Sequence, residues 1–426
     1  MEMCLQSEKQ YKMSKQNNSF MNWLDKRFPV TENLERHLTK HPVPKKVNFF
    51  YIFGALLMVI FMVQVITGIW LMMFYTNTEE GAFASVEYIM RDVEYGWLMR
   101  YMHSTGASAF FFLMYFHMFR GLLYGSYQKP KELVWLFGCF LLFLLMAEGF
   151  LGYVLPWGQM SYWAANVILS LFGAIPVIGP DLQVWIQGDY VLSGATLSRF
   201  FALHVVVVPL LMIALVVFHI FALHEVGAGN PEGVDIEKHR DEKGMPLDGA
   251  PFHPYKTFSA LPAIGIFFVI FFAIVFFAPE GGGYFLEKPN FEEADFLKTP
   301  EHIAPVWYYA PFYSILRAIT FGIPFLGITS KFLGFIIFAA SIAILFVVPW
   351  LDRSKVQSIR YKGIYSKIGM ILFAASFITL GYLGTKPVNE LRTLIAQICT
   401  LFYFLPLILM PIYTKYEKTL EVPERL

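Results

Sequence analysis

Charged residues are scarce in this chain. Asp, Glu, Lys and Arg make up 15% of its 426 residues, whereas about 25% is usual for a soluble globular protein. The net charge is +1, so the basic surface that nucleic-acid binding requires is not expected. Hydrophobic residues instead make up 56% of the chain, with 44 Phe and 23 Tyr, and this composition favours a membrane protein.

Cysteine is almost absent as well. Cys4, Cys139 and Cys399 are far apart, and two of them lie within apolar runs, so neither a zinc site nor a disulfide framework is predicted. The chain also lacks the Cys-x-x-Cys-His motif that attaches c-type haem. It offers no set of cysteine ligands for an iron–sulfur cluster. Redox groups of these two kinds would have to be supplied by other proteins.

Long apolar stretches are abundant. Eight of them are long enough to cross a bilayer, which takes roughly 20 residues of helix. Two more, 156–178 and 305–328, are interrupted by proline and polar residues, so we expect them to lie along a membrane face or to re-enter it without crossing. The sequence therefore predicts an all-α integral membrane protein with eight transmembrane helices. The eight stretches lie near residues 48–74, 100–124, 133–155, 196–223, 258–278, 331–350, 366–384 and 391–413.

Charge in the short loops predicts the orientation of the chain. The loop between the first two spans carries five acidic residues against Arg91, whereas the loops between spans 2 and 3 and between spans 6 and 7 are basic. The basic loops share a side with both termini. We therefore expect cytoplasmic termini in a bacterial inner membrane, or matrix termini in a mitochondrial inner membrane. No early apolar run precedes a small-residue cleavage site, so a cleaved signal peptide is not expected.

These spans and loops divide the chain into five segments. The first is polar, and its residues 1–20 have the composition of a disordered tail, with no role that we can infer. The expected segments are a polar cytoplasmic part at 1–47, a four-helix bundle at 48–224 with an interfacial helix at 156–178, a cytoplasmic loop at 225–257, a second four-helix part at 258–413 with an outer-face loop at 279–328, and a cytoplasmic tail at 414–426.

Four of the ten histidines lie deep inside two spans. His103 and His117 lie in the second span, and His204 and His219 in the fourth. Ionisable residues inside a membrane helix are costly and usually functional, and histidine is a common haem ligand. The fourteen-residue interval in span 2 gives roughly 21 Å along a helix and returns within roughly 40° of the same face. The fifteen-residue interval in span 4 adds an offset of roughly 60°, which a kink at Pro209 could absorb.

Spans 2 and 4 run parallel, so their histidines lie at matched depths. His103 then pairs with His204, and His117 with His219, and each pair can hold one haem iron. Spans 1 and 3 supply glycines at the same two depths, where a flat porphyrin needs space. A single histidine could equally be an interhelical hydrogen-bonding residue, and a single glycine a packing residue, but eight at matched depths favour a dihaem four-helix bundle. The glycines are Gly68 and Gly152 at one depth, and Gly54 and Gly138 at the other.

An arginine lies three residues from two of these histidines. Arg100 precedes His103, and Arg120 follows His117, each near a membrane end. Their guanidinium groups could bind anionic haem propionates. The alternative is ordinary snorkelling of arginine toward the membrane surface. With haems between the helices, we expect the propionate role.

Several short motifs lie near the ends of the spans. They are Trp97-Leu-Met-Arg-Tyr-Met-His103, Gly152-Tyr-Val-Leu-Pro-Trp-Gly158, Leu-His-Glu at 223–225, Phe252-His-Pro-Tyr255, and Pro305-Val-Trp-Tyr308 followed by Tyr313 and Leu316-Arg317. Together they resemble the cytochrome b family over about residues 20–415. The eight-span length is similar to the fused respiratory form, because the photosynthetic relatives divide the chain after span 4.

The resemblance implies the cytochrome b subunit of a quinol–cytochrome c reductase, an enzyme that contributes to the proton gradient. His103 and His204 would hold a non-covalent b haem near the outer face, and His117 and His219 one near the inner face. Ubiquinol would be oxidised at the outer face, giving one electron to a Rieske-type iron–sulfur protein. The other electron would pass through the two haems to ubiquinone at the inner face. The remaining partners implied are a cytochrome c1-type subunit, a second copy of the complex and the lipid bilayer.

The resemblance also implies two quinone pockets. The outer pocket would be formed by residues 152–158, the short helix after them and residues 301–317, with Tyr308 and Tyr313 as candidate pocket residues. The inner pocket would include His224 and its neighbours near the start of span 5.

The chain departs from the family pattern in three places. The outer motif usually has a glutamate that helps to remove quinol protons, but Val306 stands there. Glu301 is the nearest substitute, and its alternative role is a solvated loop acid. The inner pocket often has an aspartate where Ala260 stands, and span 4 has a histidine spacing of 15 where mitochondrial members have 14. The substitutes in the inner pocket are Lys256, Glu225 and His224, together with water.

Two other functions fit part of the pattern. A dihaem membrane subunit of another quinone-linked dehydrogenase would need only four or five spans, so spans 5 to 8 argue against it. A haem-free transporter could use the interrupted stretches 156–178 and 305–328 as broken helices. It would have no visible absorption, and it predicts inverted repeats that the sequence does not show.

Overall fold

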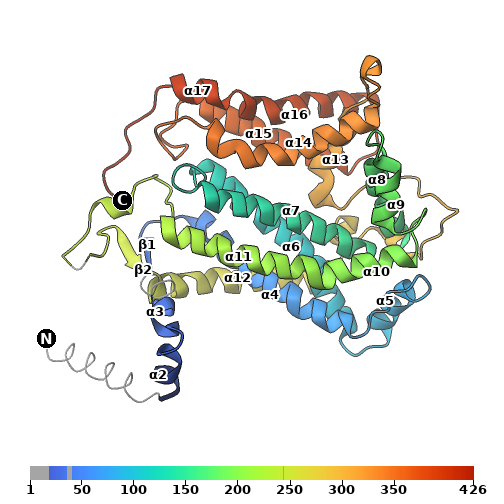
Figure 1. The fold of residues 1–426 in the computed structure, drawn as a ribbon, viewed down its shortest axis with the longest axis horizontal. Coiled ribbons are helices and arrows are strands. Elements are labelled where there is room, and N and C mark those ends of the chain that lie inside the picture. The colour runs from blue at the N-terminus through green and yellow to red at the C-terminus, as the bar shows by residue number, and fades with distance from the viewer. Residues whose placement is uncertain (1–18, 36–40, 243) are drawn as a thin grey trace.

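The computed structural model describes residues 19–35, 41–242 and 244–426, and it arranges them as a bundle of long helices (Figure 1). Among these residues, eight helices are long and apolar enough to cross a membrane, which confirms the predicted spans. They run over Phe49–Met72, Gly96–Leu123, Glu132–Val154, Gly194–Val226, Phe252–Phe277, Ser330–Leu351, Ile364–Gly384 and Glu390–Ile408.

The first four spans form a four-helix bundle. α4 packs against α6, and α7 packs against α11. Apolar residues on the outside of this bundle, such as Leu210 and Phe218, are exposed, as expected for side chains that face lipid. The spans consist of η2 (Phe49–Ile52) with α4 (Phe53–Met72), α6 (Gly96–Leu123), α7 (Glu132–Val154), and, in series, α10 (Gly194–Ala202), η3 (Leu203–Val207) and α11 (Val208–Val226).

The fourth span contains a wide turn beside His204. In η3, which is a π turn, the N–H of Val208 donates to the carbonyl of Leu203, five residues earlier. A π turn holds one residue more than an α turn, and Pro209 follows it and has no N–H to donate. The turn therefore takes up the extra residue of the His204–His219 interval, next to the proline where the sequence predicted a distortion.

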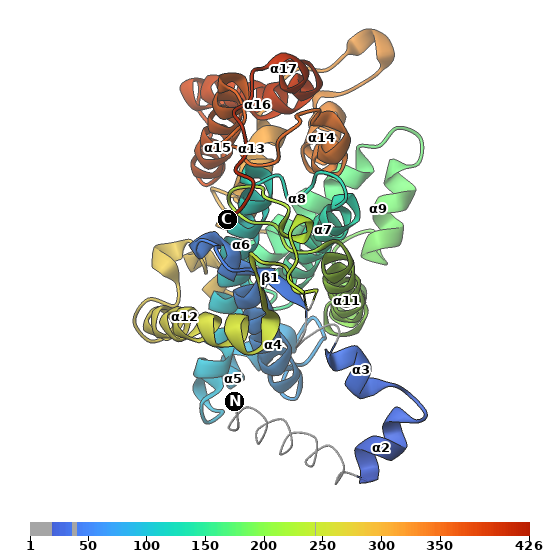
Figure 2. The same ribbon diagram turned by 90° about the vertical axis from the view of Figure 1, so that its left-hand side faces the viewer.

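The second half of the chain packs on two sides of this bundle (Figure 2). α12 contacts α4 and α6, whereas α14 contacts α7 on the other side, beside α13, α15 and α16. Stretches 156–178 and 305–328 contain helices that are not among the eight candidate spans. The elements are α8 (Gln159–Gly173), α9 (Gly179–Gln187), η4 (Ile236–Lys238), η5 (Phe252–Lys256), α12 (Thr257–Phe277), η6 (Gly281–Gly283), η7 (Lys288–Phe291), η8 (Trp307–Tyr309), α13 (Ala310–Ala318), η9 (Pro324–Leu326), α14 (Ser330–Leu351), α15 (Ile364–Gly384), α16 (Glu390–Ile408) and α17 (Met410–Tyr416).

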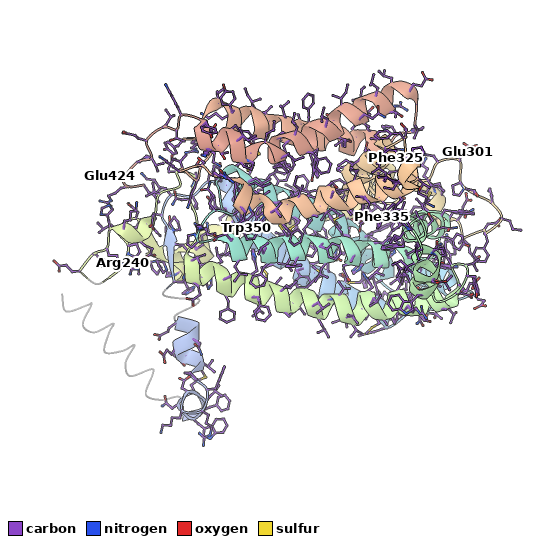
Figure 3. All side chains as sticks on the ribbon, turned by 45° about the horizontal axis from the view of Figure 1, so that its top comes forward. Arg240, Glu301, Phe325, Phe335, Trp350 and Glu424 are labelled. Carbon is purple, nitrogen blue, oxygen red and sulfur yellow. The ribbon has the colours of Figure 1, made fainter. Side chains whose placement is uncertain are left out.

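The connecting segments gather at two ends of the molecule. α5 (Ala82–Arg91), α8, α9 and α13 lie at one end, which we call the α8 end (Figure 1). The C-terminus and α17 lie at the other, the α17 end, as do the first described helices, α2 (Ser19–Asp25) and α3 (Val30–Leu34). Figure 3 shows Glu301 at the α8 end, with Arg240 and Glu424 at the opposite end. Residues 1–18 and 36–40 of the predicted polar segment 1–47 lie outside the described residues, and so does most of the expected tail 1–20.

A small antiparallel ribbon at the α17 end was not predicted. β1 (Pro42–Pro44) pairs with β2 (Gly249–Pro251), with Val43 opposite Ala250. Only helices were expected from the sequence. Strands of three residues are too short to show a period-two pattern. The paired strands are also about 200 residues apart in the sequence, so no local pattern predicts their pairing.

A buried ion pair ties two loops together at the α17 end. The Asp352 carboxylate, which follows α14, contacts the Lys362 ammonium group. It also accepts hydrogen bonds from the Tyr127 hydroxyl at 2.6 Å and from the Gln128 amide at 2.7 Å. The side chains of Lys362 and Asp352 are only 5% and 0% exposed. This network joins the loop after α6 to the loop after α14.

Candidate functional site

The first pair of predicted histidines meets between α6 and the fourth span. The ring centres of His103 and His204 are 6.2 Å apart, and the ring planes are nearly perpendicular. His103 Nδ1 lies 2.9 Å from the Thr67 hydroxyl. His204 Nδ1 lies 3.0 Å from both the backbone carbonyl and the carboxylate of Glu148. Each Nδ1 thus has an oxygen partner that can fix the orientation of the ring.

The second pair meets closer to the α17 end. The ring centres of His117 and His219 are 6.3 Å apart, with 61° between the ring planes. Arg120 lies beside this pair, with Nη2 3.2 Å from His117 Nδ1 and Nη1 3.2 Å from the Ser126 hydroxyl. Both pairs of histidines therefore meet, as expected from their matched depths in the two spans.

The four predicted glycines lie against the four histidine rings. A Cβ atom on Gly54 or Gly68 would be 3.3 Å from Cε1 of His117 or His103, respectively. On Gly138 it would be 3.5 Å from Cε1 of His219, and on Gly152 only 2.4 Å from Cε1 of His204. Glycine is thus required most strictly at position 152, where any side chain would collide with the ring.

An apolar chamber of about 390 Å³ surrounds the first pair. Its walls include His103 and His204, the glycines at 68 and 152, and Arg100. Tyr308, a predicted pocket residue, also lines it and stacks on Phe111 with ring centres 3.9 Å apart. The chamber therefore joins the first histidine pair to the Pro305–Tyr308 motif.

Hydrogen bonds and burial hold the Pro305–Tyr308 motif and the loop before it in place. The Trp307 indole donates to the Ser108 hydroxyl at 3.1 Å, and Val306 is 2% exposed. The hydroxyl of Tyr313 donates to the Ile303 carbonyl at 3.3 Å. Tyr313 is not among the residues that line the chamber.

A second, more open cavity of about 630 Å³ lies at the α8 end. Glu301 lines it with an exposed side chain, close in sequence to the motif. Glu287 also lines this cavity, but its carboxylate accepts a hydrogen bond from the Tyr153 hydroxyl at 2.7 Å. Burial raises the pKa of Glu287 to about 7, although the Tyr153 hydrogen bond lowers it. Glu287 was not predicted as a site residue, because nothing in the local sequence distinguishes it from the exposed acids of the same loop.

The predicted inner-pocket residue His224 lies at the α17 end. Its ring stacks on that of His41, with ring centres 4.2 Å apart. Ala260, which stands where many family members have an aspartate, is 8% exposed in α12. His41 was not predicted, because it precedes the first span by several residues and its contact depends on the β1–β2 region.

Comparisons with known proteins decide the family. The family model described as "Cytochrome b/b6/petB" matches residues 38–227, and the model "Cytochrome b(C-terminal)/b6/petD" matches residues 293–404. Cytochrome b of Allochromatium vinosum is 51% identical, over 97% of this chain and 99% of that protein. The chain belongs to the cytochrome b family. It is a predominantly helical cytochrome b, and its described residues include eight helices that are long and apolar enough to cross a membrane.

Two further comparisons place this cytochrome b in its complex. A solved structure titled "Hyperthermophilic respiratory Complex III" superposes with a TM-score of 0.83 and 34% identity, over 93% of this chain and 99% of that one. "Cytochrome b/c1" of Bradyrhizobium diazoefficiens is 39% identical over 95% of this chain and 56% of that protein. This chain is therefore the cytochrome b subunit of respiratory complex III, the quinol–cytochrome c reductase. Membership of the family implies b haems.

Proposed function

We propose that this cytochrome b holds two non-covalent b haems, one between His103 and His204 and one between His117 and His219. The spacing of the ring centres, 6.2 and 6.3 Å, supports this assignment. Two metal–imidazole bonds of about 2 Å, together with roughly 1 Å from each bonding nitrogen to the centre of its ring, give a spacing close to these distances. A bound haem would accept and pass on single electrons.

The arginines near the histidines would bind the haem propionates. Arg100 lines the chamber around the first pair, and the guanidinium group of Arg120 lies beside the second. A histidine that binds iron through Nε2 must keep its proton on Nδ1. We therefore expect Arg120 to leave Nδ1 of His117 when haem binds, which frees its charge for a propionate.

We place quinol oxidation at the α8 end, on the outer face of a bacterial cell membrane. The bacterial relatives and the basic loops near the α17 end support this orientation. Residues 225–257 and 414–426 are then cytoplasmic, and 279–328 lie at the outer face. Ubiquinone would be reduced at the cytoplasmic α17 end, where His224 would help to bind it.

The chamber and the second cavity would form the quinol-oxidation site. Tyr308 would contact the quinol, and Tyr313 would hold the loop of the pocket through its hydrogen bond to the Ile303 carbonyl. Val306 cannot accept a proton, so another carboxylate must do so. Glu301, which lines the second cavity, is the substitute acid predicted from the sequence.

The partners would supply the redox groups that the chain lacks. A cytochrome c1-type subunit is supported by the relative in which b and c1 form a single chain. A Rieske-type iron–sulfur protein would take the other electron of the quinol, and the complex would form a homodimer. Apolar side chains exposed on α11 and α12 would meet lipid.

Replacing Gly152 by alanine tests the first haem site. The added Cβ would lie 2.4 Å from the His204 ring, which Glu148 holds in place, so we expect the variant to lose most of one haem per chain. Haem would be counted from the difference between reduced and oxidised spectra. Gly265→Ala, in α12, is the matched control, because a Cβ there meets nothing within 4 Å. Equal haem contents in the two variants would contradict the assignment.

A further inference from the structure

Glu287 lies between the two cavities of the α8 end. Its carboxylate lines the second cavity. Its hydrogen-bond donor, the hydroxyl of Tyr153, belongs to a side chain that lines the chamber. Phe285 and Leu286, which precede Glu287, also form part of the chamber wall. One hydrogen bond of 2.7 Å therefore connects the apolar chamber with the open cavity.

We propose that Glu287 is the carboxylate that takes a proton from quinol, with Tyr153 as the intermediate donor, in place of the glutamate that position 306 lacks. This inference rests on the proposed quinol-oxidation site. Val306 is apolar and 2% exposed, so it has no carboxylate that could accept the proton. The proposal assigns that role to Glu287.

The other carboxylates near the chamber fit this role less well. Glu301 is exposed, and its side chain has no contact with Tyr153 among the described interactions. Glu148 lines the chamber, but it contacts Nδ1 of His204 and would be engaged in orienting that ring. Glu287 alone of the three combines partial burial, a hydrogen bond to a residue of the chamber wall and access to the open cavity.

The proposed transfer accounts for one of the protons that quinol oxidation releases. Oxidation of quinol to quinone releases two protons and two electrons, and the electrons leave one at a time to the acceptors of the reductase. For one proton, a quinol O–H bond breaks and its proton goes to the oxygen of Tyr153. Tyr153 gives its own hydroxyl proton to the Glu287 carboxylate, which then releases it to water in the second cavity.

The ionisation of Glu287 suits this role. Burial raises its pKa to about 7, so a proton can be both taken up and released near neutral pH. The titratable neighbours are Tyr153 from α7 and Tyr308 from η8, which is close enough to interact electrostatically with Glu287. Around the second cavity lie Tyr284, Glu292, Lys298, Glu301, His302 and Lys386.

Glu287→Gln in the complete complex tests the proposal. We expect quinol-dependent reduction of cytochrome c to slow by about 100-fold or more. The rise in activity with pH near 7, which reports the ionised carboxylate, should disappear. The matched control is Glu293→Gln, an exposed acid of the same loop that lines neither cavity, and it should keep its turnover and its pH profile. Unchanged turnover and pH profile in the Glu287 variant, or a large loss in Glu301→Gln alone, would overturn the proposal.

Two further measurements keep the result interpretable. The haem-to-chain ratio of each variant shows whether the site assumed by the proposed function is intact, so a loss of haem is distinguished from a loss of proton transfer. If the Glu287 variant does not assemble, Tyr153→Phe takes its place. Without the Tyr153 hydroxyl that relays the proton, turnover should fall as it does in Glu287→Gln. The activity that remains should rise at a higher pH, because the lost hydrogen bond lowers the pKa of Glu287. Unchanged turnover with an unshifted profile in Tyr153→Phe would overturn the proposal.

Discussion

Replacing His204 by leucine is expected to remove one of two b haems and to abolish quinol-dependent reduction of cytochrome c. Leucine has no nitrogen to bind iron, and its partner His103, 6.2 Å away between ring centres, cannot supply both axial ligands. The haem content of the purified complex should fall from two to one b haem per chain. Activity should fall to background, because electrons can no longer pass between the two ends of the molecule.

His219→Leu makes the matched comparison at the second site. It should also leave one haem, but the remaining haem should differ from that of His204→Leu in its reduction potential, because the two sites have different surroundings. His239→Ala, in an exposed loop at the α17 end, should keep both haems. Loss of both haems in each single variant, at normal levels of folded complex, would contradict two independent sites.

Replacing Lys362 by methionine is expected to destabilise the protein strongly. The Asp352 carboxylate is 0% exposed, and the substitution would leave its charge buried without a counter-ion. Loss of one partner from a buried ion pair costs about 3–5 kcal/mol. The apparent melting temperature of the detergent-solubilised complex should fall clearly. The double variant Asp352→Leu and Lys362→Met should recover most of that loss, since an apolar pair leaves no charge buried. A double variant no more stable than Lys362→Met would contradict this account.

The same pair should stabilise the protein throughout the neutral range. Burial alone would raise the pKa of Asp352, but Lys362 and the hydrogen bond from Tyr127 offset this and hold the pKa below its usual range. A lowered pKa means that the stabilisation is present above the ordinary aspartate pKa and is lost only as pH falls through the lowered one. The contribution of this pair therefore disappears only in acid.

The sequence predicted the parts of this structure that depend on periodicity along one helix. The eight spans follow from apolar length, and the pairing of His103 with His204 follows from helical rise and the alternation of span direction. The extra residue between His204 and His219 pointed to a distortion near Pro209, and the π turn η3 lies next to that proline. Each of these features is set by residues within a single span or by the order of the spans.

Features that depend on contacts between distant segments were not predictable. Tyr153 and Glu287 are 134 residues apart, and Asp352 and Tyr127 are 225 apart. Neither contact leaves a local pattern, because a loop acid that is buried by tertiary packing has the same sequence as one that is solvated. The sequence could report that Val306 lacks a carboxyl group. It could not show that the fold connects Glu287 to the chamber wall through Tyr153.

The haem content of the wild-type complex is the most direct test of the central claim that this chain holds two haems between four histidines. Haem that is not covalently bound would be extracted from purified complex, quantified, and compared with the amount of this chain. Two non-covalent haems per chain, both reducible in the difference spectrum, are the predicted result. One haem or none, in complex shown to be folded and made with sufficient haem, would contradict the claim.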